Sequence, residues 1–299
     1  MRLLITGSSG FIGSYVAEEA RARGHTVVSF DIAENPRDDF RDFSAIKNAC
    51  EKAKPDTVIH LGALPSTQQS IREPAVTYET NIRGTWNVLE ATRLSGARRI
   101  VFASSAAVYG KTGEEYAGKP LSEDLPLKPK NPYGLAKKIC EQMMELWSRN
   151  GLLDVIDGVS LRFFNVFGLR QKRDSAYATA VERFLHQVKQ KEPLTVVSPG
   201  TQRRDMIFVK DVARAIILAA ESTKCFQGVA LNIGSGKNYS IQEIADIIGG
   251  KKYPRVMLPP RAGDVQEVLA DISRAKTLLN WSPEVSFEEG IEIIKKCKQ

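Results

Sequence analysis

The hydrophobic positions of the first thirty-one residues predict a strand, a glycine turn, a helix and a second strand. The apolar run 2–6 leads into Gly7-Ser8-Ser9-Gly10-Phe11-Ile12-Gly13, after which apolar residues recur at helical spacing. Gly24 ends this helix, and the run 25–30 forms a second strand that ends at Asp31. Together these segments predict one βαβ unit with glycines at its turn.

The same alternation of strands and helices continues through the first half of the chain. Strands are predicted at 56–61, 99–103 and 155–164. Helices are predicted at 44–54, 74–95 and 133–150. The segments 65–70 and 111–131 are predicted loops. Because strand and helix alternate, we expect a doubly wound α/β fold of the Rossmann type around a parallel sheet.

Beyond Gly168 the alternation becomes less regular. Further elements are predicted as helices at 176–190 and 212–221, strands at 194–197 and 230–233, and a helix capped by Ser240. We therefore expect two parts, a cofactor-binding Rossmann domain over 1–165 and a smaller α/β substrate-binding lobe over 166–299. Segments of the lobe are expected to thread back onto the first domain.

The glycine turn has the pattern of a dinucleotide site. Gly7 permits the tight turn, Gly10 lets the backbone approach a pyrophosphate at the helix amino terminus, and Gly13 lets helix and strand pack closely. A carboxylate at Asp31 accepts hydrogen bonds from a ribose 2′-hydroxyl and repels a 2′-phosphate. Because no Arg follows at 32 or 33, the sequence favours NAD over NADP.

Composition narrows the class of protein. The chain has 299 residues and 42% hydrophobic content, which suits a globular protein with a substantial core. It shows neither a signal peptide nor an apolar run of about 18 residues, so we expect a cytoplasmic protein without a membrane span. The four cysteines and three histidines lack metal-ligand spacing, and we expect free thiols and no metal site.

The formal net charge of +7 does not point to nucleic acid. Lys and Arg are spread along the whole chain, without a basic block or interleaved aromatic residues. We therefore expect no nucleic-acid partner. Part of the excess charge could serve an anionic small substrate, which needs only two or three placed cations.

Candidate catalytic residues follow the predicted strand 99–103. Ser104-Ser105-Ala106-Ala107-Val108-Tyr109-Gly110 lies at its carboxyl end, where open α/β sheets place their chemistry. Tyr133 and Lys137 are four residues apart on a predicted helix and share one face. A Lys ammonium about 4 Å from the phenol, at an effective dielectric of about 20, would lower the phenol pKa by about three units. Tyr133 is thus a candidate general base, Lys137 its activator and Ser105 a hydrogen-bonding relay.

With the glycine motif, the Ser105 segment and Tyr133-x-x-x-Lys137 together, the chain resembles the extended short-chain dehydrogenase/reductases of the nucleotide-sugar epimerase and dehydratase group. The resemblance extends from Arg2 to the C-terminal segment. It implies NAD as cofactor and a UDP-sugar as substrate. The cofactor contacts that it implies are Gly7, Gly10, Phe11, Ile12, Gly13, Asp31, Asp39, Phe40, Leu61, Gly62, Ala63, Thr80 with Asn81, Ala103, Tyr133, Lys137 and Phe164. The substrate contacts that it implies are Ser105, Tyr133, Asn165, Arg204, Arg261 and Asp264.

The residues after Ser105 favour one reaction within this group. Dehydratases resemble one another in carrying an Asp-Glu pair where this chain has Ala106 and Ala107, and decarboxylases usually have a Glu at the second position. Alanine supplies neither acid nor base. We therefore expect 4-epimerisation, most simply of UDP-glucose and UDP-galactose. The resemblance also places Val268 where a tyrosine or cysteine often borders the sugar 2-substituent, and because valine is smaller than tyrosine, an N-acetylated sugar would also fit.

Several alternatives remain open at this stage. Another epimerase, a reductase or a dehydratase of the same group would share these motifs, and a catalytically silent NAD-binding sensor or scaffold is a different class. The apolar stripe of the helix Tyr133–Asn150 is wider than one sheet contact needs. It could pack in a deep core, or it could form a homodimer interface together with the helix Asn81–Ser95.

Overall fold

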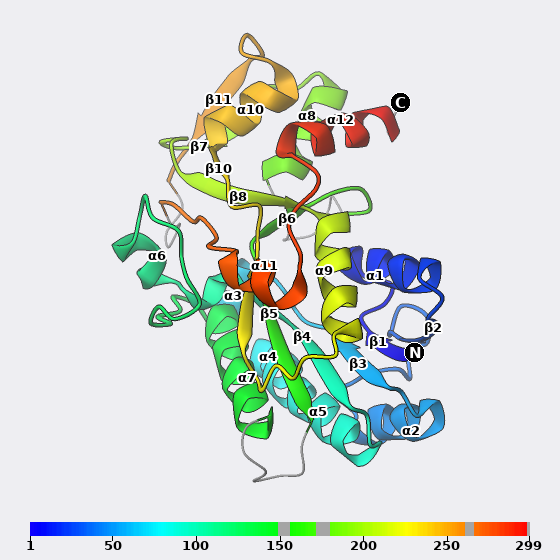
Figure 1. The fold of residues 1–299 in the computed structure, drawn as a ribbon. Coiled ribbons are helices and arrows are strands. Elements are labelled where there is room, and N and C mark those ends of the chain that lie inside the picture. The colour runs from blue at the N-terminus through cyan, green and yellow to red at the C-terminus, as the bar shows by residue number, and fades with distance from the viewer. Residues whose placement is uncertain (149–155, 172–179, 261–265, 298–299) are drawn as a thin grey trace.

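A six-stranded parallel sheet forms the centre of the computed structural model, which describes residues 1–148, 156–171, 180–260 and 266–297. The strand order is β2-β1-β3-β4-β5-β9 (Figure 1). These strands are β1 (Arg2–Thr6), β2 (Thr26–Phe30), β3 (Thr57–His60), β4 (Arg99–Ser105), β5 (Asp157–Phe163) and β9 (Ala230–Ile233). Every pair of neighbours is parallel, which confirms the predicted α/β class.

The order of the strands places a crevice at the centre of the sheet. From β1 the chain first forms β2 on one side and then crosses to β3 on the other side. Ligands of open α/β sheets bind beyond the carboxyl ends of the strands at such a switch point. The last strand, β9, comes from the C-terminal part of the chain and completes the sheet beside β5.

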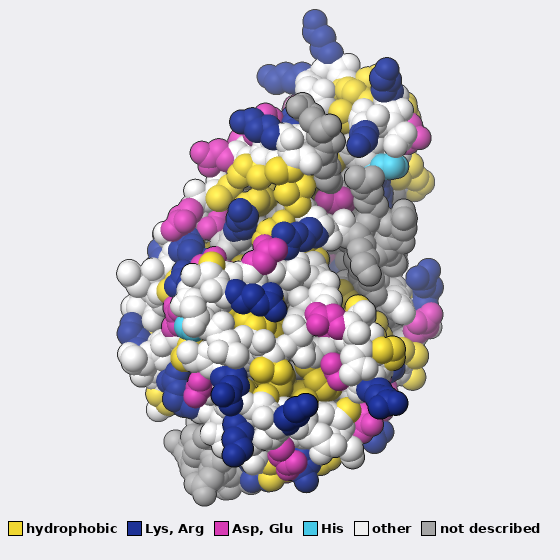
Figure 2. Space-filling model, turned by 90° about the vertical axis from the view of Figure 1, so that its right-hand side faces the viewer, with side chains coloured by type: hydrophobic (Ala, Val, Ile, Leu, Met, Phe, Trp, Pro, Cys, Tyr) yellow, Lys and Arg dark blue, Asp and Glu magenta, His cyan; other side chains and the backbone are white. Residues whose placement is uncertain are grey.

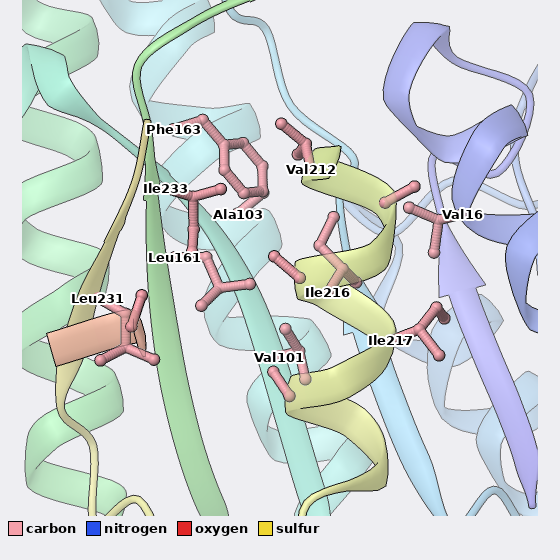
Figure 3. Packing of buried hydrophobic residues seen from close by; sticks show 14 of the residues in the cluster. Val16, Val101, Ala103, Leu161, Phe163, Val212, Ile216, Ile217, Leu231 and Ile233 are labelled. Carbon is pink, nitrogen blue, oxygen red and sulfur yellow. The ribbon is translucent and has the colours of Figure 1, made fainter. Parts of the chain in front are cut away.

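Helices cover both faces of this sheet. One face carries α1 (Phe11–Ala22), α9 (Val209–Glu221) and α11 (Ser273–Leu279), and the other carries α2 (Phe43–Ala53), α5 (Gly84–Leu94) and α7 (Pro132–Ser148) (Figure 1). Leu3 and Ile5 belong to the core beneath α1 and α9, whereas Leu4 belongs to the opposite core, as the two-residue period of a strand requires. Figure 3 shows Ile216 of α9 packed over Val101 of the sheet.

A smaller lobe has its own core and is built from segments that come before and after β9 in the chain. It contains the three-stranded sheet β10-β8-β6 and the pair β11-β7. Its strands are β6 (Asn165–Phe167), β7 (Leu194–Val197), β8 (Arg203–Phe208), β10 (Asn238–Ser240) and β11 (Arg255–Leu258). Its helices are α8 (Ala180–Gln190), α10 (Ile241–Gly249) and α12 (Phe287–Cys297). Ser240 caps α10 in a capping box with Glu243, as the sequence predicts.

The predicted single helix over 74–95 is interrupted. The structure has α4 (Pro74–Tyr78), a π-helical turn η1 (Glu79–Arg83) and then α5. Within this turn, the carbonyl oxygen of Asn81 accepts hydrogen bonds from the Thr85 hydroxyl at 2.6 Å and from the Cys140 thiol at 3.0 Å. Side chains that bond into a helical ladder locally widen it, and π turns of this kind often occur at functional sites.

The predictions of loops at 65–70 and 111–131 were wrong in part. The first contains the short helix α3 (Thr67–Arg72), whose amino end is capped by Ser66 through the backbone N–H of Gln69 at 3.0 Å. The second contains α6 (Lys111–Glu115), and a 3₁₀ turn, η2 (Ala106–Val108), precedes it. The start of the helix predicted at 176–190 lies outside the described residues, which resume at Ala180.

The surface carries mixed charges. On the face in Figure 2, Lys and Arg side chains are interspersed with Asp and Glu over the full height of the molecule. Within the described ranges, no helix has the length and apolar character needed to cross a membrane. The four cysteines are free thiols, with Cys50 and Cys140 buried and Cys225 and Cys297 exposed.

Candidate active site

The glycine turn between β1 and α1 lies at the switch point of the sheet. Gly7 has φ +70°, in the left-handed region that glycine adopts without strain. A Cβ on Gly13 would lie 2.0 Å from the carbonyl oxygen of Gly7, and a Cβ on Gly7 would lie 2.8 Å from the nitrogen of Gly62. The first turn of α1, with Phe11 and Ile12, has no side-chain cap. Its N–H groups can therefore bind an anion such as a pyrophosphate.

Asp31 lies beside this turn, directly after β2. One carboxylate oxygen accepts the backbone N–H of Ser9 at 2.9 Å, and the other accepts that of Ala33 at 2.8 Å. Glu34, which the sequence reasoning missed, accepts hydrogen bonds from the hydroxyls of Ser8 and Ser9. Two carboxylates thus border the place where a ribose would lie beside the turn, and both would repel a 2′-phosphate.

Asp39 and Phe40 lie between β2 and α2, and Phe40 packs toward the end of β3. Arg41 pairs with Asp39 at 2.6 Å, and these hydrogen bonds hold the pKa of the Asp39 carboxyl below its usual value. The ring of Phe40 packs so closely on two backbone segments that a Cβ on Gly62 or Gly84 would come within 2.6 and 2.5 Å of it, respectively. Phe40 therefore lies against the residues that follow β3.

The end of β3 is held by the π turn. Leu61, Gly62 and Ala63 follow the strand, and the side-chain amide of Asn81 brackets the next residue, Leu64. Its Oδ1 accepts the Leu64 N–H at 2.8 Å, and its Nδ2 donates to the Leu64 carbonyl at 3.0 Å. The position of the residues predicted to border the cofactor is thus fixed by a side chain of the π turn.

Thr80 of the π turn provides a direct test of whether a cofactor fits. Its hydroxyl oxygen is buried and has no hydrogen-bond partner among the described residues. A buried polar atom without a partner costs about 1–3 kcal/mol, and a ligand oxygen in the crevice would supply one. Together with the uncapped start of α1 and the close approach at Gly13, this residue fits the binding of a dinucleotide.

A buried histidine links β1 to the π turn. The Thr85 hydroxyl donates to the carbonyl of Asn81, so it must accept a hydrogen bond from His60 Nε2, which lies at 3.0 Å. His60 Nδ1 then accepts from the Thr6 hydroxyl at 2.7 Å. Burial, and secondly the charge of Lys137, lower the pKa of His60 to about 3. His60 is therefore a neutral connecting residue and is not a proton donor at neutral pH.

The three candidate catalytic residues lie together at the carboxyl end of β4. Tyr133 and Lys137 are on the first turns of α7, both buried, and Ser105 lies close enough to the Tyr133 hydroxyl to act on its pKa. The ammonium of Lys137 donates to the carbonyl oxygen of Ala103 at 2.6 Å and lies 6.0 Å from the centre of the Tyr133 ring. Two elements, β4 and α7, therefore bring all three side chains to one point.

The pKa of Tyr133 differs from the sequence-based expectation. Burial raises it above its usual value, and the hydrogen bond from Ser105 only partly opposes this effect. Burial also lowers the pKa of Lys137 to about 8. The physical reason is that both groups have left water, and the ammonium is bound to the carbonyl of Ala103 instead of the phenol.

The residues after Ser105 provide no acid or base. Ala106 and Ala107 form the 3₁₀ turn η2, and the hydroxyl oxygen of Ser105 accepts the backbone N–H of Ala107 at 3.2 Å. Proton transfer in this site therefore has to use Tyr133 or a group outside this turn.

The predicted substrate residues are only partly within the described ranges. Phe164 is buried, and Asn165 of β6 donates to the backbone carbonyl of Asp205 at 3.1 Å. Arg204 of β8 donates to the carbonyl of Arg203 at 2.8 Å. Arg261 and Asp264 lie outside the described residues. Val268 is placed beside β8, because its N–H donates to the Arg203 carbonyl at 3.3 Å.

The chain matches one known protein family over most of its length. The model described as "NAD dependent epimerase/dehydratase family" matches residues 3–234. The chain belongs to this family. The match covers the glycine turn, Asp31 and the three candidate catalytic residues, so NAD is the cofactor of its family.

Relatives in this epimerase/dehydratase family act on different sugars. The UDP-glucose 4-epimerase of Mycolicibacterium smegmatis is 33% identical over 97% of this chain and 96% of its own length. The UDP-glucuronate 4-epimerase of Thermodesulfobacterium geofontis is 32% identical over 97% and 93%. The UDP-N-acetyl-α-D-glucosaminuronate decarboxylase of Bacillus cytotoxicus is 30% identical over 97% and 95%.

A solved structure supports the same fold. The UDP-glucose 4-epimerase of Thermotoga maritima, solved with UDP-glucose, aligns with a TM-score of 0.91 at 30% identity and covers 100% of both chains. The comparisons therefore establish a nucleotide-sugar epimerase family and its fold, while the sugar differs between its members.

A buried ion pair beneath this site was not found from the sequence. Glu141 of α7 and Arg162 of β5 form a bidentate pair with a shortest contact of 2.8 Å. The Ser104 hydroxyl, one residue before Ser105, donates to the same carboxylate. The only sequence signal was that Glu141 follows Lys137 by four residues on a helix. In the described residues, no group of three His, Cys, Asp or Glu side chains could hold a metal.

Proposed function

We propose that this protein is a nucleotide-sugar 4-epimerase that interconverts UDP-glucose and UDP-galactose. The observation that carries the proposal is the grouping of Ser105, Tyr133 and Lys137 beside a glycine turn, with alanines in the two positions that follow Ser105. Relatives with this activity at 30–33% identity support it.

The residues that would hold NAD line the crevice from the glycine turn to Tyr133. The first turn of α1 would bind the pyrophosphate, Asp31 the adenosine ribose and Lys137 the nicotinamide ribose. The redox chemistry that bound NAD supplies is the removal of hydride from C4 of the sugar and its return to the opposite face.

Tyr133 would take the proton of the sugar 4-hydroxyl as C4 is oxidised and give it back as the other epimer forms. Ser105, which lies beside the phenol, would orient the sugar oxygen toward it. Because burial raises the pKa of Tyr133, the phenol needs positive charge nearby to ionise. Lys137 supplies one charge, and the oxidised nicotinamide would supply a second.

The alanines after Ser105 favour epimerisation over the other reactions of the family. Elimination of the C6 hydroxyl requires an acid and a base close to C5 and C6, and Ala106 and Ala107 offer neither. The reaction open to a 4-keto sugar formed here is therefore the return of hydride to C4. Turning the sugar over in the pocket before that return would give the 4-epimer.

The proposal is tested by incubating purified protein and NAD with UDP-galactose and separating the products by anion-exchange chromatography. We expect UDP-glucose to form until equilibrium is reached, with no net consumption of NAD. Unchanged UDP-galactose after long incubation would disprove the assignment. Conversion of UDP-glucuronate in a parallel reaction would instead assign the protein to the other 4-epimerase substrate among its relatives.

Val268 favours a second substrate, a UDP-sugar with an N-acetyl group at C2. The residue is half-buried beside β8, and valine occupies less volume than the tyrosine that, like cysteine, is often found at this position in the family. We expect turnover of UDP-N-acetylgalactosamine at a measurable rate. Complete rejection of the acetamido sugar alongside turnover of UDP-galactose would refute this extension.

A different class, a non-catalytic NAD-binding sensor, would bind NAD without turnover. The complete catalytic trio is the argument against it, since a sensor does not need Ser105 beside Tyr133. The product assay separates the two classes.

A homodimer through the helices predicted at Asn81–Ser95 and Tyr133–Asn150 is part of the proposal. Adjacent helices carry large apolar side chains that are well exposed, among them Val76 at 45%, Leu135 at 38% and Leu146 at 57%. A second copy would bury these side chains. Light scattering should give twice the chain mass, and Leu146→Glu should shift it to the monomer mass.

A further inference from the structure

One face of α7 carries three functional groups in succession. Tyr133, Lys137 and Glu141 are spaced by four residues, which places neighbouring side chains one above the other on a helix. All three are buried. The first two belong to the proposed catalytic trio, and nothing in that chemistry yet uses the third.

The carboxylate of Glu141 is held in place from two strands. From β5, Arg162 donates through Nε at 3.0 Å and through Nη2 at 2.8 Å, while the Ser104 hydroxyl of β4 donates from the other side. Both side chains of the ion pair are less than a tenth exposed, at 5% for Arg162 and 8% for Glu141. Arg162 also donates to the Tyr109 hydroxyl at 3.0 Å, so its position is fixed as well.

Lys137 depends on its surroundings for its charge. The groups that face its ammonium are Tyr133, Cys140 and Glu141 on α7, His60 on β3, and Phe102 and Ala103 on β4. Burial raises the pKa of Cys140 to about 11 and lowers that of His60 to about 3, so both are neutral at pH 7. Cys140 and then Glu141 oppose the effect of burial on the pKa of Lys137, and since the Cys140 thiol is neutral at pH 7, Glu141 is the negative charge among these groups.

We propose that Glu141, fixed by Arg162 and Ser104, keeps the buried ammonium of Lys137 charged and is thereby a positioning residue for the Tyr133–Lys137 pair. The inference rests on the proposed function only for its effect on turnover. We expect replacement of the ion pair by neutral groups to change Lys137, because Glu141 shares a helix face with Lys137 and acts on its ammonium, whereas Arg162 lies on β5.

The experiment measures the ionisation of Lys137 directly. Lysines are labelled with ¹³C at Cε, the Lys137 signal is assigned by its loss in Lys137→Met, and the protein is titrated from pH 6 to 10. The wild-type midpoint is expected near the pKa of about 8. In Glu141→Gln/Arg162→Met, we expect the midpoint to fall by about half a pH unit or more. The double variant removes both charges, so no unpaired buried ion threatens the fold.

Asp157→Asn is the matched control. Asp157 is a buried acid at the start of β5 and pairs with Arg99 at the start of β4. Ser104 and Arg162, which hold Glu141, lie near the other ends of these two strands. The control should lose stability and leave the Lys137 midpoint unchanged. A midpoint that stays fixed or rises in the double variant, or one that moves equally in the control, would overturn the proposal.

Turnover gives the second readout. On whichever UDP-sugar the protein converts, the alkaline limb of the kcat profile should move to lower pH by the same amount as the Lys137 midpoint. A midpoint shift without movement of this limb would overturn the positioning role. Failure to convert any UDP-sugar would reject the proposed function alone, because the titration needs no substrate.

Discussion

Removal of the Tyr133 hydroxyl is the sharpest perturbation of the proposed chemistry. Tyr133→Phe keeps the ring of a residue that is 9% exposed and removes the hydroxyl beside Ser105. Removing one polar group of this kind costs at most about 1 kcal/mol of stability, so the variant should fold. Because the ring still lines the crevice and the glycine turn is untouched, its affinity for NAD should stay within about threefold of wild type.

Turnover should respond quite differently. General acid–base groups contribute about a hundredfold to ten-thousandfold, so kcat on UDP-galactose should fall at least about a hundredfold, equivalent to about 2.7 kcal/mol of barrier. Chromatography of timed samples gives the rate, and calorimetry gives the NAD affinity. Tyr15→Phe, which removes another largely buried hydroxyl bonded to the Leu169 carbonyl, is the control and should retain turnover. Near-normal turnover of Tyr133→Phe would refute Tyr133 as the base.

Three further changes test other parts of the site. Since Lys137 must carry its proton and its pKa is about 8, turnover should fall as pH rises through 8; a flat rate from pH 7 to 10 would contradict this requirement. Gly13→Ala should abolish NAD binding in calorimetry, because a Cβ there lies 2.0 Å from a backbone oxygen; Gly24→Ala is strained at φ +79°, but its Cβ meets open space and the variant should still bind. Arg162→Met should lower the free energy of unfolding in urea by about 3–5 kcal/mol, and adding Glu141→Gln should restore part of this loss. An equal loss of stability in the single and the double variant would contradict the ion-pair argument.

The first βαβ unit could be predicted from the sequence because its signals are local. The run 2–6, the glycines and Asp31 each report on residues close in the chain, and the structure places them at one crevice. Tyr133 and Lys137 were likewise predicted to share a face because helical spacing alone requires it.

The parts that could not be predicted depend on contacts between distant segments. The helix over 74–95 is interrupted at Asn81, whose carbonyl accepts a bond from Cys140, 59 residues away. Which nitrogen of His60 carries the proton depends on its contacts with Thr6 of β1 and Thr85 of α5. The partner of Glu141 is Arg162, on β5. Lys137 was expected to act on Tyr133, yet its ammonium is bound to a backbone carbonyl that no local pattern identifies.

The central claim is that hydrogen leaves C4 of the sugar and returns to it within one closed site. UDP-glucose carrying deuterium at C4 tests it directly, with the isotope content of the UDP-galactose product read by mass spectrometry. The account predicts product that retains the deuterium at C4 in ordinary water. Product in which C4 carries hydrogen from the solvent would contradict it.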